Sequence, residues 1–357
     1  MKRSILFGAM LALLATTSHA HHSRSHLDFS KEVDIQGRVS SYDWANPHIY
    51  ITVDVVNQAG ETEHWLLETN HTLSMSERGW ARDSLKVGDL VSARGAPNRN
   101  PEKTHMFPAV VVKADGAELW ASERRNPNAV PLPPLEVEPR DALAFTGPWT
   151  SRVVDQIKDY LVLYEGAEFP TPPRGEREPS PLNEAGQAML ANMNPDEDPF
   201  LQCIGSYPLA GGMFPSHLSW QGDNLVIRGE FDGVERVIHM GENVDPASAE
   251  RSRLGYSSGR IENNQLIIET TRFEHTTWGL MEGVDSSEQK RMVERYWLEN
   301  EGRIMRAEVT VEDPLYLARP MVSQFEYGYV PNHEFQLYEC DVEAANRHLE
   351  MVDQHQP

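Results

Sequence analysis

Residues 31–56, KEVDIQGRVSSYDWANPHIYITVDVV, decide the fold of the first part of this 357-residue chain. Apolar and polar residues alternate in the first half, which puts Val33, Ile35 and Val39 on one face of an extended strand. The second half, from His48 onward, is rich in β-branched residues and continues the pattern. The stretch therefore predicts two successive amphipathic strands.

The segments that follow complete a recognisable element order. Residues 61–69 predict a third strand and residues 72–85 have helical character, while residues 86–97 and 107–120 predict two more strands. The order β-β-β-α-β-β is that of an OB-like five-stranded barrel, which we expect over residues 21–120. Many OB folds bind nucleic acid, but 54 acidic against 32 basic residues give a net charge of −22, which argues against that partner.

A second all-β unit is predicted after a proline-rich linker at residues 121–145. Three hairpins are expected within residues 224–240, 259–274 and 289–313, each around a short polar or glycine-containing turn. With the neighbouring strands they predict a closed antiparallel barrel of about eight strands over residues 146–342. Residues 343–357 are predicted to form a C-terminal tail.

The first 20 residues have the pattern of a secretory signal. Lys2 and Arg3 precede an apolar run, and small residues occupy the expected cleavage positions before His21. The run is shorter than the roughly 20 residues that a membrane span needs, and no later segment is apolar enough to span. We therefore expect a periplasmic protein that begins at His21 and has no membrane span.

Cys203 and Cys340 are the only cysteines of the chain. Two cysteines in an exported protein most simply form one disulfide. The alternative, a pair of metal-binding thiolates, lacks the close C-x-x-C spacing of such sites.

Histidines gather at the predicted mature N-terminus. The α-amine and imidazole of His21 can chelate one ion, and His48 is the first choice for a further imidazole. His22 can also bind copper through the local backbone, and the other candidate ligands are His26, His64 and His71. The predicted cofactor is copper; the alternative is a flexible polar N-terminus with surface histidines.

Two sets of residues are candidates for chemistry in the second unit. Glu269 and Glu294 lie in strand patterns and can serve as general acid or base if they face the interior, with His239 beside them. The alternative is an outward position or a structural ion pair, such as Glu294 with Arg272 or Arg306. The candidates for lining a ligand cavity, rather than simply filling the core, are Trp149, Trp220, Tyr256, Trp278 and Arg295. No phosphate loop or dinucleotide fingerprint occurs, which disfavours nucleotide cofactors.

Both units resemble known families. Residues 21–120 resemble a widespread, functionally uncharacterised family of exported bacterial proteins, through the His21-His22-Ser23 start, the stretch Trp44–His48 and LKVGDLVSARGAP at 85–97. Residues 146–342 resemble a lipocalin-like exported family without a settled activity, through TGPW at 146–149 and GYSSGRIENNQLIIETTRF at 255–273. Residues 241–246 and 255–261 depart from the usual pattern of this lipocalin-like family, because they lack an Arg, two His and a Trp that the family usually carries. The resemblance implies a barrel with a cup for an apolar ligand.

Taken together, these patterns predict an exported two-barrel protein that binds a small, mainly apolar molecule in its second barrel and holds copper at its N-terminus. Two alternatives stay open. One is a cofactor-independent isomerase, hydratase or lyase that uses a barrel glutamate, and the other is a periplasmic copper carrier or copper oxidase. The sequence leaves the oligomeric state open.

Overall fold

A computed structural model describes residues 26–76, 78–121, 138–151, 181–194, 197–205, 215–231, 233–241, 246–347 and 349. The predicted signal segment, His21 and His22 lie outside the described residues, as does most of the predicted linker. Strands dominate what is described, so the predicted all-β class is confirmed. Within the described residues, no helix has both the length and the apolar composition needed to cross a membrane.

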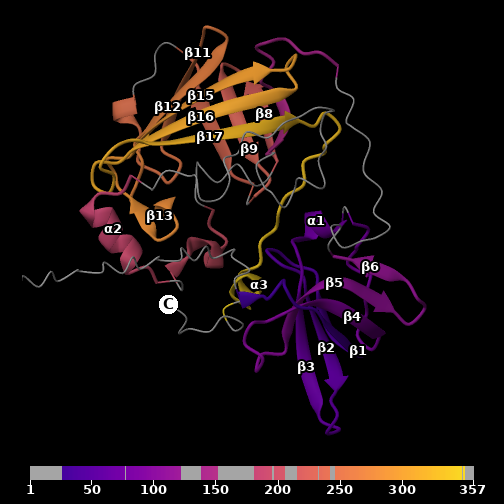
Figure 1. The fold of residues 1–357 in the computed structure, drawn as a ribbon. Helices are drawn as coiled ribbons and strands as arrows, with labels where there is room; N and C mark the ends of the chain where they lie inside the picture. Colours follow the sequence, from indigo (N-terminus) through magenta and orange to yellow (C-terminus); the bar gives the residue numbers. More distant parts are fainter. Residues whose placement is uncertain are drawn as a thin grey trace, which may run out of the picture.

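The N-terminal barrel has the predicted OB-like order (Figure 1). Its elements are β1 (Val33–Asp43), β2 (Tyr50–Val56), β3 (Thr62–Glu68), α1 (Thr72–Ser76), β4 (Leu90–Pro97), β5 (His105–Lys113) and β6 (Glu118–Trp120). The sheet order is β3-β2-β1-β4-β5-β6, and parallel pairing between β3 and β5 closes a five-stranded barrel. α1 falls between β3 and β4, where an OB-like fold carries its helix.

Alternation along β1 positions the core of this barrel. Ile35 and Val39 are buried and Val33 packs against them, as their spacing predicts. Gly37 lies between them because β2 passes very close: a Cβ there would meet the carbonyl oxygen of Asp54 at 2.2 Å. The first strand therefore serves both as a core face and as a tight contact with its neighbour.

The C-terminal barrel is also closed, with nine strands. These are β7 (Gly147–Ser151), β8 (Ser216–Gln221), β9 (Asn224–Gly229), β10 (Glu235–His239), β11 (Tyr256–Glu262), β12 (Gln265–Thr271), β15 (Arg291–Glu299), β16 (Ile304–Glu312) and β17 (Met321–Tyr329). All three predicted hairpins are present, as β9–β10, β11–β12 and β15–β16. The β10–β11 pair is parallel, unlike the antiparallel neighbours expected throughout, because a longer connection joins these strands instead of a tight turn.

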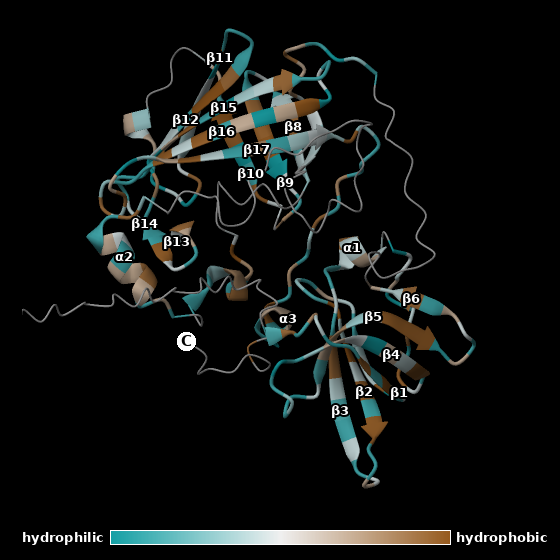
Figure 2. Cartoon of the chain, in the orientation of Figure 1, coloured by the Kyte–Doolittle hydropathy of each residue, from teal (hydrophilic) through white to brown (hydrophobic). Residues whose placement is uncertain are grey.

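Side chains fill much of the interior of the C-terminal barrel. Figure 2 shows hydrophobic and hydrophilic residues alternating along strands such as β16, whose apolar residues are buried. Trp149 is fully buried, and its indole N–H donates to the carbonyl oxygen of Phe145 at 2.8 Å. A separate hairpin of β13 (Thr276–Met281) and β14 (Val284–Ser286) lies beside α2 (Glu184–Ala191).

An ion pair is buried among these apolar side chains. Arg236 of β10 donates two hydrogen bonds to the carboxylate of Glu294 on β15, and both side chains are almost fully buried. Ser257 and Thr270 accept the remaining guanidinium bonds, while the Tyr296 hydroxyl donates to Glu294 at 2.7 Å. The sequence alternative of a structural ion pair between Glu294 and an arginine is thus correct in kind. The arginine is Arg236, however, and not Arg272 or Arg306.

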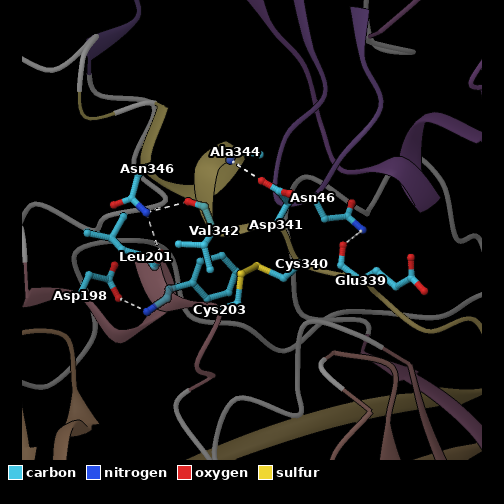
Figure 3. Close-up of a disulfide and its surroundings, with 11 residues drawn as sticks. Asn46, Asp198, Leu201, Cys203, Glu339, Cys340, Asp341, Val342, Ala344 and Asn346 are labelled. Atoms are coloured by element: carbon cyan, nitrogen blue, oxygen red, sulfur yellow. Dashed lines mark hydrogen bonds between the residues drawn. A yellow bond between two sulfur atoms is a disulfide. The ribbon is translucent and has the colours of Figure 1, made fainter.

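The C-terminal segment joins the two barrels. Beyond β17 the chain runs back to the N-terminal barrel, where α3 (Val342–Arg347) packs (Figure 1). The predicted Cys203–Cys340 disulfide is present and spans 137 residues of sequence. Asn46 of the N-terminal barrel forms a β-bridge with Cys340 and donates its amide to the carbonyl oxygen of Glu339 at 3.0 Å (Figure 3).

Removing the disulfide should destabilise the protein. Native disulfides of this kind typically contribute about 2–5 kcal/mol, largely by restricting the unfolded chain. We expect the Cys203→Ser/Cys340→Ser variant to unfold at lower denaturant concentration than the wild type in equilibrium unfolding followed by tryptophan fluorescence. Identical midpoints, or thiols that alkylate in the unreduced wild type, would contradict the assignment.

Breaking the buried ion pair should have a larger effect than breaking an exposed one. Glu294→Gln leaves the Arg236 charge buried without its counter-ion, which costs about 3–5 kcal/mol. Glu269→Gln is the matched control, because Glu269 pairs with Arg260 and Arg291 on the exposed face, where such pairs contribute about 0–1 kcal/mol. Equal losses in chemical denaturation would show that the buried pair has no special structural role.

Candidate metal centre

Two histidines and a glutamate converge where the N-terminal barrel closes. Glu68 is the last residue of β3, His105 is the first residue of β5, and His26 lies just ahead of β1. Parallel pairing sets Leu66 opposite His105, which brings the end of β3 to the start of β5. Each residue offers one ligand atom, and all three atoms lie within 4.8 Å of one another.

The carboxylate of Glu68 is the centre of this group. Its Oε2 lies 3.3 Å from Nε2 of His105 and 3.6 Å from Nε2 of His26. Its Oε1 lies 3.6 Å from Nδ1 of His48, which is also 2.9 Å from the carbonyl oxygen of Thr69. Three imidazoles therefore surround one carboxylate; we call His26, His48, Glu68 and His105 the N-terminal cluster.

Several polar atoms of this cluster are buried without hydrogen-bond partners. The side chain of Glu68 is 3% exposed and that of His105 is fully buried. Oε2 of Glu68, Nε2 of His105 and both ring nitrogens of His26 are buried without a hydrogen bond of good geometry. Most buried polar atoms in proteins have a partner, and an ion between these atoms would provide one.

The charge state of Glu68 suits a cation. Burial raises the pKa of its carboxyl group, but the neighbouring His48 charge and the close imidazoles of His105 and His26 outweigh this effect. The pKa of Glu68 therefore lies well below its ordinary value. The carboxylate is held ionised, which is the form that binds a metal.

The backbone on either side of Asn98 holds two of the imidazoles in place. The N–H of Asn98 donates to the carbonyl oxygen of His105 at 2.8 Å, and the N–H of Arg99 donates to that of His26 at 2.7 Å. The side-chain amide of Asn98 lies 3.4 Å from Nδ1 of His105, so Nε2 is the nitrogen that faces Glu68. The imidazole rings of His26 and His105 stack with their centroids 5.2 Å apart.

Only part of this cluster was predicted from the sequence. His48, the first choice for a ligand, and His26, one of the alternatives, both belong to it, whereas His21 and His22 lie outside the described residues. His64 instead pairs with Asp54 on the surface, and His71 contacts Tyr338. Glu68 and His105 were not predicted from the sequence. Glu68 could have been noticed, because it is a charged residue directly after the apolar run Trp65-Leu66-Leu67.

The predicted acid/base residues of the second barrel do not form one site. Glu294 faces the interior and is bound by Arg236, whereas Glu269 lies in exposed ion pairs on the outer face. His239 lies on that outer face too, where its ring stacks against Tyr256 with centroids 4.5 Å apart. Period-two alternation separates Glu269 from Glu294, because cross-strand partners Ile268 and Glu294 share the inward face.

The predicted cavity residues are similarly dispersed. Trp149 lies inside the barrel, within its packed core. Trp220 is 51% exposed, Arg295 is exposed on β15, and Tyr256 stacks on the outer face. Trp278 is buried, but it belongs to the β13–β14 hairpin and not to the barrel strands. The structure therefore does not bring these five residues together.

Comparison with known families matches the N-terminal part of the chain. Residues 9–107 match the model of a family described as a family of unknown function (DUF6152). The matched stretch contains all four residues of the N-terminal cluster. Neither a curated protein nor a solved structure matches the chain.

Proposed function

We propose that the chain is an exported metal-binding protein whose N-terminal barrel holds one divalent transition-metal ion. The observation that carries this proposal is the buried, ionised carboxylate of Glu68 between two imidazoles. One ligand atom each from Glu68, His26 and His105 lies within 4.8 Å of the other two, and these atoms are buried without hydrogen bonds of good geometry. His48 lies 3.6 Å from the other oxygen of Glu68, and its Nδ1 donates to the carbonyl oxygen of Thr69, so this side chain supports the carboxylate rather than binding the ion. A buried carboxylate needs a positive partner, and among the described residues the groups paired with Glu68 are imidazoles.

Copper(II) is the ion that this set of donors favours. Imidazole suits copper, zinc, iron and nickel, and affinity for a given nitrogen and oxygen site generally peaks at copper in the divalent series. The amine and imidazole of His21 belong to the same proposal as further copper ligands. Zinc is the competing ion, since sites with histidine and carboxylate ligands also bind it.

A role in holding or carrying the ion fits this site better than catalysis on a large substrate. His105 is fully buried and Glu68 nearly so, which leaves little of the cluster open to a bulky molecule. The disulfide and the signal-like N-terminus support the periplasm as the place where the protein acts. Copper carriage in that compartment is therefore the function that we favour.

Binding of a small apolar molecule by the C-terminal barrel stays a proposal of its own. The closed nine-stranded barrel supports it, because barrels of this size can enclose one small ligand. The packed core around Trp149 limits the space for such a ligand. Acid/base catalysis by a barrel glutamate has less support, since Arg236 occupies both carboxylate oxygens of Glu294.

The N-terminal cluster should bind one metal ion through Glu68 and His105. We expect metal-free protein to take up one equivalent of Cu²⁺ at this site, with Zn²⁺ bound more weakly, in native mass spectrometry and competition titrations. Glu68→Gln keeps the shape of the side chain but removes the charge, and we expect it to weaken binding by at least about 10-fold. His105→Ala should weaken binding further because it removes a ligand.

The matched control is His64→Ala, which removes an exposed histidine paired with Asp54 on the same strand as Glu68. This variant should bind copper as the wild type does. Circular dichroism of each metal-free variant checks that the barrel remains folded. The proposal fails if folded Glu68→Gln and His105→Ala bind copper with wild-type affinity, or if the wild type takes up no stoichiometric metal.

A further inference from the structure

A second group of two histidines and a glutamate lies in the C-terminal part of the chain. His217 is on β8, Glu230 follows the end of β9, and His333 lies shortly after β17. β8 and β9 pair with Ser216 opposite Gly229, so His217 and Glu230 lie at the same end of this hairpin. One ligand atom from each of the three residues lies within 4.8 Å of the other two.

The carboxylate of Glu230 again forms the centre. Its Oε1 lies 2.7 Å from Nε2 of His333 and 3.6 Å from Nε2 of His217. The backbone N–H of Gln336 donates to the same oxygen at 2.9 Å. The imidazole rings of His217 and His333 have their centroids 5.9 Å apart, so both rings border the same small space.

Burial differs across this group. Glu230 is fully buried, while the side chains of the two histidines are each 24% exposed. Oε2 of Glu230 and Nε2 of His217 are buried without a hydrogen-bond partner. The carboxylate thus lies deep, and the imidazole side chains lie nearer the surface.

Arg228, two residues before Glu230, does not pair with this carboxylate. The guanidinium of Arg228 lies 3.9 Å from the centroid of the Phe335 ring and is 3.5 Å from Glu235. No arginine or lysine is paired with Glu230 among the described residues, in contrast to the Arg236–Glu294 pair of the same barrel. The charge of Glu230 is therefore left to the two imidazoles.

We propose that His217, Glu230 and His333 form a second metal site, which takes a divalent ion of the zinc class. Two histidines and one glutamate are the ligand set of zinc sites that keep a fourth position open for water or substrate. The partial exposure of both histidines is consistent with such an open position. This site is independent of the N-terminal cluster, with which it shares no residue.

The surroundings hold the three ligands in place. The carbonyl oxygen of Glu230 accepts the N–H of Tyr338 at 2.7 Å, and Phe231 forms a β-bridge with Tyr338. The same short segment carries His333 at one end and the disulfide-bonded Cys340 at the other. Both chain segments that meet at the site are therefore fixed by backbone pairing close to a covalent link.

The test uses the full chain, stripped with a chelator and then loaded with Zn²⁺ or with Co²⁺ as a spectroscopic substitute. We measure stoichiometry by native mass spectrometry and affinity by competition with a chromogenic chelator. Measurements are made in the Glu68→Gln/His105→Ala background, so that the N-terminal cluster does not contribute. We expect one ion per chain in this background and visible Co²⁺ absorption typical of a nitrogen- and oxygen-ligated site.

Adding His217→Ala/His333→Ala to that background should abolish uptake, and adding Glu230→Gln should weaken it by at least about 10-fold. The matched control is His275→Ala, which removes an exposed histidine paired with Asp285 at 3.0 Å. Thermal unfolding of the metal-free variants checks that each is folded. The proposal is overturned if the background variant binds no zinc or cobalt, or if folded variants of His217, His333 and Glu230 bind like the control. Because the N-terminal cluster is scored in separate variants, either proposal can fail alone.

Discussion

A buried carboxylate must be matched by positive charge, and this constraint organises both barrels. Four glutamates, Glu68, Glu230, Glu294 and Glu326, are almost entirely removed from water, and Glu326 pairs with Arg306. Ionised groups in such places cost several kcal/mol unless a partner compensates them. Glu294 meets a guanidinium that binds both of its oxygens, whereas Glu68 and Glu230 are approached by imidazoles. Arginine compensates charge permanently, but imidazole does so only when it is protonated or shares an ion. The choice of partner thus separates a structural pair from two metal-site candidates.

Barrel closure explains why these groups meet although they are distant in sequence. The N-terminal barrel closes through parallel pairing of β3 with β5, and that pairing brings Glu68 to His105. Residues at the ends of strands can face one another across such a seam without interrupting the apolar interior. The second group follows the same logic, since it lies at the end of the β8–β9 hairpin and beside the chain that leaves β17. In both cases the polar residues stand where regular pairing begins or ends.

The sequence predicted the architecture better than it predicted the sites. Period-two alternation, turn residues and element order suffice for an OB-like barrel and for a second closed barrel, because local patterns determine strands. The Cys203–Cys340 disulfide also followed from the cysteine count. Neither metal-site candidate follows from local pattern, because His26, Glu68 and His105 meet only through strand register. Likewise, Glu269 and Glu294 look equivalent in sequence, and only the register places one outside and one inside.

The segment that connects the two barrels, residues 333–340, also forms part of the second candidate site. The segment from His333 to Cys340 starts at one ligand, passes Tyr338 beside Glu230, and ends where Asn46 of the N-terminal barrel pairs with it. Tyr338 also contacts His71, three residues after Glu68. Tyr338 thus contacts elements adjoining both candidate sites, and the Cys203–Cys340 bond fixes the segment that carries it. A change in the position of this segment would therefore alter Glu230 and the loop after Glu68 together, which gives the two barrels a direct physical connection.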